Sequence, residues 1–122
     1  MSVDEGLFAW VQEALEPLGT VSLRRMMGGA TLYLDGTIFA ILHQGELWFK
    51  ADEQSNALWD DQGCERFTVT FKTGMVDSMN YRRAPSEVYD DPEALQRWAK
   101  PAIEAGLRRP LKKRSRTRPK RT

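Results

Sequence analysis

A helical pattern of apolar positions opens the chain. Six apolar residues lie three or four positions apart, which places them on one face of a helix: Leu7, Trp10, Val11, Ala14, Leu15 and Leu18. Gly19 then supplies a stop, because glycine readily takes the backbone conformation that ends a helix. The pattern predicts an amphipathic helix over residues 4–18.

Strand patterns follow this helix. Residues 21–26 predict one strand, and residues 31–34 and 37–42 predict two more. Asp35-Gly36 separates these two and is a strong signal for a two-residue hairpin turn. Residues 38–42 are apolar on both faces, which predicts a central strand or a partner that covers its second face.

The meander continues through Gln44-Gly45, which allows a turn into a fourth strand over residues 47–50. Asp52 is a suitable N-cap for a short helix over residues 52–62. Residues 67–71 alternate between apolar and polar and predict a strand, and a turn at Gly74 leads into another over residues 75–81. These two strands predict a second hairpin.

The last helix begins at Asp91-Pro92, a cap followed by the residue favoured at the first helical position. Its apolar stripe consists of Leu95, Trp98, Ala99, Ala102 and Ile103. Pro101 interrupts it, and an interior proline costs a helix about 3 kcal/mol. We expect a kink or a break at Pro101, helix on both sides as far as Ala105, and the end of the ordered domain at Gly106.

The order is helix, four strands, helix, two strands, helix. Strands grouped in runs predict an α+β fold with an antiparallel sheet of about six strands flanked by three helices. We expect residues 1–106 to form this single domain. The apolar runs are too short to span a membrane, and the N-terminus lacks the basic region of a signal peptide. We therefore expect a cytoplasmic protein without membrane contact.

Charge divides the chain in two. All 17 Asp and Glu lie in residues 1–106 with nine Lys and Arg, a net charge of −8. Residues 107–122 hold the other nine Lys and Arg and no acid. This tail contains only two sizeable hydrophobic residues, too few to offset the entropy of ordering it, so we expect it to be disordered.

Nine cations without an acid suit the phosphates of a nucleic acid, and the lack of aromatic residues predicts little sequence preference. The expected contacts are Arg108, Arg109, Lys112, Lys113, Arg114, Arg116, Arg118, Lys120 and Arg121. The alternative is that the tail folds back on the acidic domain.

No residue set forms a convincing catalytic or metal site. His43, the only histidine, is expected at a solvated turn without a nucleophile or an orienting partner beside it. Cys64, the only cysteine, is expected to be a partly buried, inert thiol, with Arg66 and Glu65 exerting opposite effects on its pKa. We expect no enzyme activity, metal or cofactor.

Paired charges have ordinary explanations in most places. Asp60-Asp61 and Asp90-Asp91 fit helix ends and surface positions, and Arg82-Arg83 fit a solvated strand end. Arg24-Arg25 differ, because strand alternation sends them to opposite faces. One should point inward or toward the sheet edge, where it needs a carboxylate or carbonyl partner, or it contacts a partner molecule.

Several short segments follow one another in a specific order. Arg24-Arg25-Met26-Met27-Gly28-Gly29 opens a hairpin, followed by Leu32 to Gly36, Phe39-Ala40, Gly45 to Lys50, Phe67-Thr68, Met79 and Tyr81, Pro85, and Asp91 to Ala99. Over nearly all of residues 5–106 the chain closely resembles the N-terminal domain of the TfoX/Sxy family. The commoner family pattern has Met-Phe-Gly-Gly where this chain has Met26-Met27-Gly28-Gly29.

The resemblance implies an α+β domain with an antiparallel sheet flanked by helices. It also implies bacterial competence regulation, in which TfoX-type proteins act as transcriptional coactivators with the cyclic-AMP receptor protein. It carries over no catalytic residue. Longer members have a second, C-terminal domain, and we expect this chain to be a stand-alone version with a basic tail instead. The motif from Arg24 to Gly29 is expected to be structural or to bind a partner.

Two functions follow from these features. The chain is a regulatory or adaptor protein that binds a protein partner of the transcription machinery and contacts nucleic acid through its tail. Alternatively, it is an oligomeric protein-interaction module without a nucleic-acid role. In both cases we expect a homodimer, because residues 38–42 are apolar on both faces and Trp48 lies on the opposite face from Leu47 and Phe49.

Overall fold

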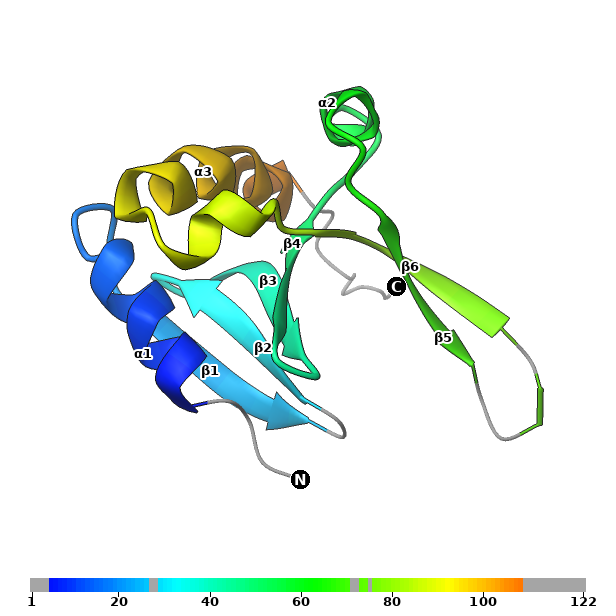
Figure 1. Cartoon of the computed structure of the whole chain (residues 1–122), viewed down its shortest axis with the longest axis horizontal. Helices are drawn as coiled ribbons and strands as arrows, with labels where there is room; N and C mark the ends of the chain where they lie inside the picture. The colour runs from blue at the N-terminus through cyan, green and yellow to red at the C-terminus, as the bar shows by residue number, and fades with distance from the viewer. Residues whose placement is uncertain (1–4, 27–28, 71–72, 75, 109–122) are drawn as a thin grey trace, which may run out of the picture.

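The computed structural model describes residues 5–26, 29–70, 73–74 and 76–108 (Figure 1). In chain order its elements are α1 (Glu5–Ala14), β1 (Val21–Met26), β2 (Gly29–Leu34), β3 (Thr37–His43), β4 (Glu46–Lys50), α2 (Asn56–Asp61), β5 (Arg66–Thr70), β6 (Val76–Arg83), the 3-10 helix η1 (Ser86–Tyr89) and α3 (Pro92–Arg108). This is the predicted α+β order, with η1 as an addition. The boundaries of β1 agree with the prediction, and β2, β3 and β4 differ from it by one or two residues at one end. β5 begins one residue earlier and β6 ends two residues later than predicted, and residues 71 and 75 of the predicted strands lie outside the described residues.

All six strands form one antiparallel sheet in the order β1-β2-β3-β4-β6-β5. Asp35-Gly36 forms the predicted tight turn between β2 and β3, with positive φ angles of 49° and 86°. The Asp35 carboxylate also accepts a hydrogen bond from the N–H of Thr20 at 3.0 Å. The turn therefore also fixes the position of Thr20, the residue that precedes β1.

Helices cover one face of the sheet. α1 and α3 lie together over β1 to β4, as Figure 1 shows. Side chains from both layers form the core, among them Val11, Leu15, Leu32, Phe39, Leu42, Leu47, Phe49, Leu95, Ala99 and Ala102. Along β2, buried and half-buried side chains alternate, which is the period of two that predicted the strand.

The other face of the sheet carries a second, smaller core. It consists of Ile41, Trp48, Phe67 and Tyr81, with Ile38 packed against them. The rings of Trp48 and Phe67 meet edge to face with their centroids 4.9 Å apart. The hairpin of β5 and β6 thus supplies, within one chain, much of the cover that was expected from a second copy. A homodimer stays a prediction.

Both helices before β5 are shorter than predicted. α1 ends at Ala14 because Pro17 opposes helix just before it, and residues 15–18 form a turn. α2 begins at Asn56, not at residue 52, and its N-cap is Ser55. The N–H of Asp52 donates to Ser55 Oγ at 3.0 Å, and the N–H of Ser55 donates to Asp52 Oδ1 at 3.1 Å. Asp52 therefore closes a turn before the helix.

The last helix is longer than predicted. α3 continues through Pro101 to Arg108, so the break expected at Pro101 does not occur, and Gly106 does not end the folded chain. Gly106 is instead a contact point with β3, where a Cβ atom would overlap the carbonyl oxygen of Ile38. This close packing of α3 on the sheet offsets the loss of one helical hydrogen bond. In the part of the chain described, no helix is long and apolar enough to cross a membrane.

Candidate functional site

The arginines of β1 lie at the edge of the sheet. Arg24 and Arg25 are both exposed, and Arg25 forms an ion pair with Glu5 at 3.7 Å. Of the two placements expected for these residues, inward or at the sheet edge, the structure shows the edge. Charged side chains on an edge strand also discourage pairing with other strands.

The buried arginine is Arg82, which was expected to be solvated. It lies on β6 and is 3% exposed. Its guanidinium donates to Asp60 Oδ1 at 2.7 Å, to the carbonyl oxygen of Cys64 at 3.1 Å and to Asn56 Oδ1 at 3.2 Å. Arg82 thus ties α2 and the segment after it to the sheet, which is a structural role.

The described part of the motif from Arg24 to Gly29 also has a structural explanation. Met26 ends β1 and Gly29 begins β2, whereas Met27 and Gly28 lie outside the described residues. A Cβ atom on Gly29 would overlap the carbonyl oxygen of Leu42 on β3, so only glycine fits there. Partner binding by this motif stays a prediction.

His43 and Cys64 lie apart from any nucleophile–base arrangement among the described residues. His43 ends β3 and is half-buried, so its expected place at a solvated turn is wrong. Its ring centroid lies 5.1 Å from that of Phe67. Cys64 is buried, and burial raises the pKa of its thiol, opposed by Arg82 and not by Arg66. The raised pKa favours an inert thiol.

The paired carboxylates have separate structural roles. Asp60 binds Arg82, and Asp91 Oδ1 caps α3 by accepting the N–H groups of Glu93 at 3.0 Å and Ala94 at 3.3 Å. Within residues 5–26, 29–70, 73–74 and 76–108, no group of three or more His, Cys, Asp and Glu is placed to hold a metal ion.

Arg108 belongs to the folded domain. As the last residue of α3, it binds Asp52 through two hydrogen bonds, Nε to Oδ2 at 2.8 Å and Nη2 to Oδ1 at 2.9 Å. This pairing with Arg108 lowers the pKa of Asp52 to about 2. The other expected nucleic-acid contacts lie outside the described residues: Arg109, Lys112, Lys113, Arg114, Arg116, Arg118, Lys120 and Arg121.

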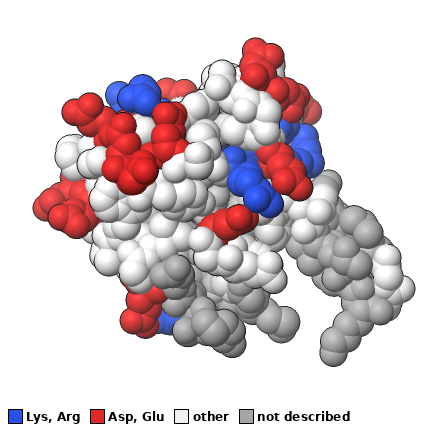
Figure 2. All heavy atoms as spheres, in the orientation of Figure 1, with Lys and Arg blue, Asp and Glu red and all other residues white. Residues whose placement is uncertain are grey.

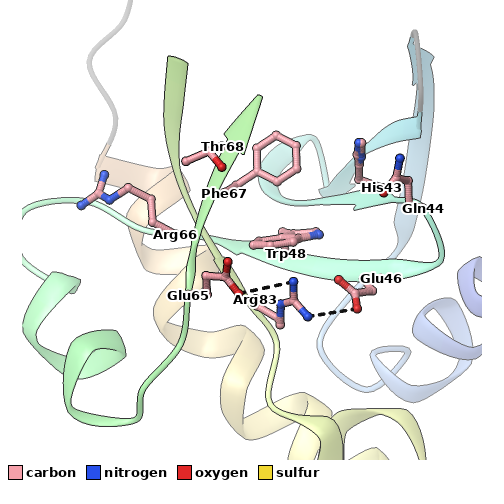
Figure 3. Close-up of a pocket in the computed structure, with 9 residues that line it drawn as sticks. All are labelled: His43, Gln44, Glu46, Trp48, Glu65, Arg66, Phe67, Thr68 and Arg83. Atoms are coloured by element: carbon pink, nitrogen blue, oxygen red, sulfur yellow. Dashed lines mark hydrogen bonds and ion pairs between the residues drawn. The ribbon is translucent and has the colours of Figure 1, made fainter. Parts of the chain in front are cut away.

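A polar pocket of about 190 Å³ lies where β3, β4, β5 and β6 come together. We call it the Trp48 pocket. Figure 3 shows its lining: His43, Gln44, Glu46, Trp48, Glu65, Arg66, Phe67, Thr68 and Arg83. At its base, the guanidinium of Arg83 lies 5.0 Å from the centroid of the Trp48 ring. Arg83 also pairs with Glu46 at 3.2 Å and Glu65 at 3.4 Å, so its charge is balanced.

Sequence reasoning did not find this pocket. Trp48 on β4 is paired directly with Arg83 on β6, although the chain forms α2 and β5 between them. The predicted meander and hairpin gave no indication of which strand would lie next to β4. The turn signal at Gln44-Gly45 was present, but it said nothing about the residues that this turn would meet.

The chain also matches a known family. The family model described as the TfoX N-terminal domain matches residues 13–106. The chain belongs to the TfoX N-terminal domain family. Protein Sxy of Escherichia coli (strain K12) is 32% identical over 101 residues, which cover 80% of this chain and 46% of Sxy. The DNA transformation protein TfoX1 of Aliivibrio fischeri is 29% identical over 79 residues, 65% of this chain and 35% of TfoX1.

The resemblance stated from the sequence is therefore confirmed. The TfoX N-terminal domain match includes every strand of the sheet, the motif from Arg24 to Gly29 and the whole Trp48 pocket. It ends at Gly106, before the basic segment. The chain spans less than half the length of either of these two relatives.

Proposed function

We propose that this chain is a TfoX-type regulatory protein that acts by binding other macromolecules and not by catalysis. Its membership of the TfoX N-terminal domain family carries the proposal. One relative is named a DNA transformation protein, so we place this chain in competence-related regulation. A role in transcription also fits a cytoplasmic location.

The separation of charge supports contacts of two kinds. Residues 1–106 have a net charge of −8, and red predominates over blue on the face drawn in Figure 2. Such a surface suits a basic protein partner, which we propose to be a component of the transcription machinery. Of the nine Lys and Arg in residues 107–122, Arg108 is bound to Asp52 and the other eight suit phosphates, so we propose that this segment contacts nucleic acid.

Complementation tests the regulatory role. The chain is expressed in Escherichia coli that lacks Sxy, and transcripts of DNA-uptake genes are measured. We expect the transcripts to rise above those of a strain with an empty vector. Expression of intact Sxy is the positive control. Unchanged transcripts despite soluble chain at a level equal to Sxy would contradict the competence-related role.

The second candidate is an oligomeric protein-interaction module without nucleic-acid binding. The exposed apolar side chain of Met79 favours it, since Met79 is 38% exposed and lies opposite Phe67 of the second core, where a second copy could contact it. Sedimentation of the full chain tests for the homodimer, and a gel shift tests for nucleic-acid binding. A dimer that shifts no DNA at low salt would support this candidate over the first.

A further inference from the structure

Two buried nitrogen atoms of the Trp48 pocket lack partners. Trp48 Nε1 and His43 Nδ1 form no hydrogen bond with any described residue, and Trp48 is only 6% exposed. Leaving a buried polar group unpaired destabilises a protein, so native structures rarely do it without a reason. Both residues line the same cavity. Their unmet hydrogen bonds point to a ligand that brings its own polar atoms.

The rest of the lining indicates what kind of ligand fits. Gln44 offers an amide donor and acceptor, and Thr68 a hydroxyl that serves as either. Glu46 and Glu65 each form one ion pair with Arg83 and retain lone pairs for further donors. Positive and negative side chains are equal in number, with Arg66 and Arg83 against the two glutamates. The pocket thus favours a neutral group with both donors and acceptors.

The wall of the pocket is aromatic. The ring of Phe67 contacts both His43 and Trp48, with ring centroids 5.1 Å and 4.9 Å apart. In Figure 3, His43 lies next to Gln44 and across from Phe67, Trp48 lies below them, and the guanidinium of Arg66 points away from these rings. Arg66 forms no ion pair with any described residue. A flat group inside the pocket would leave this cation free for a negative group outside it.

We propose that the Trp48 pocket binds one unstacked nucleobase of a single-stranded nucleic acid. A base is flat and neutral and carries donors and acceptors along its edge, whereas an isolated phosphate or carboxylate would face Glu46 and Glu65. The base bonds Gln44 and Trp48, and Arg66 binds the adjoining phosphate. Trp48 Nε1 does not reach solvent in this structure, so we expect side chains at the rim to shift on binding. The proposal rests on the nucleic-acid role proposed above.

Indole N–H signals in the NMR spectrum of the full chain test this site. Trp59 Nε1 is also buried without a partner, but it lies in the main core and not in the pocket, so it is the internal control. We expect thymidine or another nucleoside to shift the Trp48 signal to saturation and to leave Trp59 unmoved. No shift with any of the four nucleosides, or an equal shift with inorganic phosphate alone, would overturn the proposal.

A matched pair of variants tests the contact with the base. Gln44→Ala removes an exposed amide at the pocket, and Gln54→Ala removes one in the turn before α2. For single-stranded oligothymidine at high salt, we expect Gln44→Ala to bind about tenfold more weakly and Gln54→Ala to bind as the unchanged chain does. Equal binding of oligothymidine by the two variants would overturn the proposal. A loss of duplex DNA binding in Gln44→Ala as large as its loss of oligothymidine binding would also overturn it.

The nucleoside separates this proposal from that for the basic segment, because it has no phosphate. A salt-sensitive gel shift without any nucleoside effect would leave the basic segment as the nucleic-acid contact and exclude the pocket. A saturating nucleoside shift without a gel shift would exclude the basic segment and keep the pocket.

Discussion

Arg82 holds a positive charge almost entirely away from water. Its partners are the carboxylate of Asp60, the amide oxygens of Asn56 and Asn80, and the carbonyl of Cys64. Asp60 itself is 66% exposed, so water lies close to one end of the ion pair. Removing the carboxylate leaves a buried cation with neutral acceptors only, and an uncompensated buried charge is costly.

We expect Asp60→Ala to lower the free energy of unfolding by about 1–2 kcal/mol, less than for a fully buried pair because Asp60 is exposed. Asp61→Ala is the matched control, since Asp61 is an exposed neighbour on the same helix and forms none of these bonds. Urea unfolding measures both. Equal stability of the two variants would show that Asp60 contributes nothing to holding Arg82.

The ion pair between Asp52 and Arg108 predicts a dependence of stability on pH. The pKa of Asp52 falls from 3.8 to about 2 on folding, chiefly through its hydrogen bonds from Arg108. A lowered pKa means that the stabilisation is complete above pH 3.8 and is lost as the pH falls through about 2.

We expect the unchanged chain to lose about 1 kcal/mol more stability than Asp52→Asn between pH 5 and pH 2, a value limited by the partial exposure of the pair. Thermal unfolding at several pH values measures the difference. Parallel pH profiles for the two proteins would show that the pair is too solvated to matter.

At the scale of elements, one glycine determines how closely α3 approaches β3. Alanine favours a helix over glycine by about 1 kcal/mol, so helix propensity alone predicts that Gly106→Ala stabilises the protein. The added Cβ would meet the backbone of Ile38, which cannot move aside as a flexible side chain can. The packing effect should exceed the propensity effect.

We expect Gly106→Ala to destabilise the chain by about 1–3 kcal/mol, the usual cost of overpacking a core. Gly6→Ala is the control, because Gly6 lies exposed in the first turn of α1 and should be neutral or slightly stabilising there. Thermal unfolding of the two variants gives the comparison. A stabilising Gly106→Ala would mean that α3 shifts freely on the sheet.

Local patterns predicted most elements, since they depend on neighbouring residues. Alternation placed the strands, Asp35-Gly36 placed a hairpin, and Asp91 capped α3 as expected. Predictions failed where the structure of a segment depends on contacts with residues far away in the sequence. Pro101 is tolerated because α3 packs on β3, and Asp52 closes a turn and binds Arg108 instead of capping a helix.

The candidate site depends on such distant partners throughout. Arg83 lies opposite Trp48 only because β6 pairs with β4. Arg82 and Arg83 are neighbours on a strand, so their side chains point to opposite faces of the sheet, and Arg82 is the one that is buried. Two adjacent arginines therefore have opposite environments, one between α2 and the sheet and one over Trp48. No spacing in the sequence shows which of the two is buried.

At the scale of the whole molecule, positive charge lies where the domain ends. Because Arg108 is occupied by Asp52, a truncation after Arg108 keeps α3 and this ion pair and removes eight of the nine cations of residues 107–122. It is therefore a cleaner variant than one ending at Gly106, which would disturb the last turn of α3.

We expect the full chain to bind duplex DNA with little sequence preference and the truncation to lose this binding at the same salt concentration. If the segment contacts about six phosphates, log K should fall with log salt at a slope of about −5. Gel shifts over a range of salt measure it, with Arg24→Gln as a control that removes a cation from the domain only. In the alternative, the basic segment folds back on the acidic domain, which then competes with DNA for its Lys and Arg. Neutralising exposed acids such as Glu13 and Glu16 should in that case strengthen the binding of DNA by the full chain. A truncation that binds as tightly as the full chain would remove the basic segment from the mechanism.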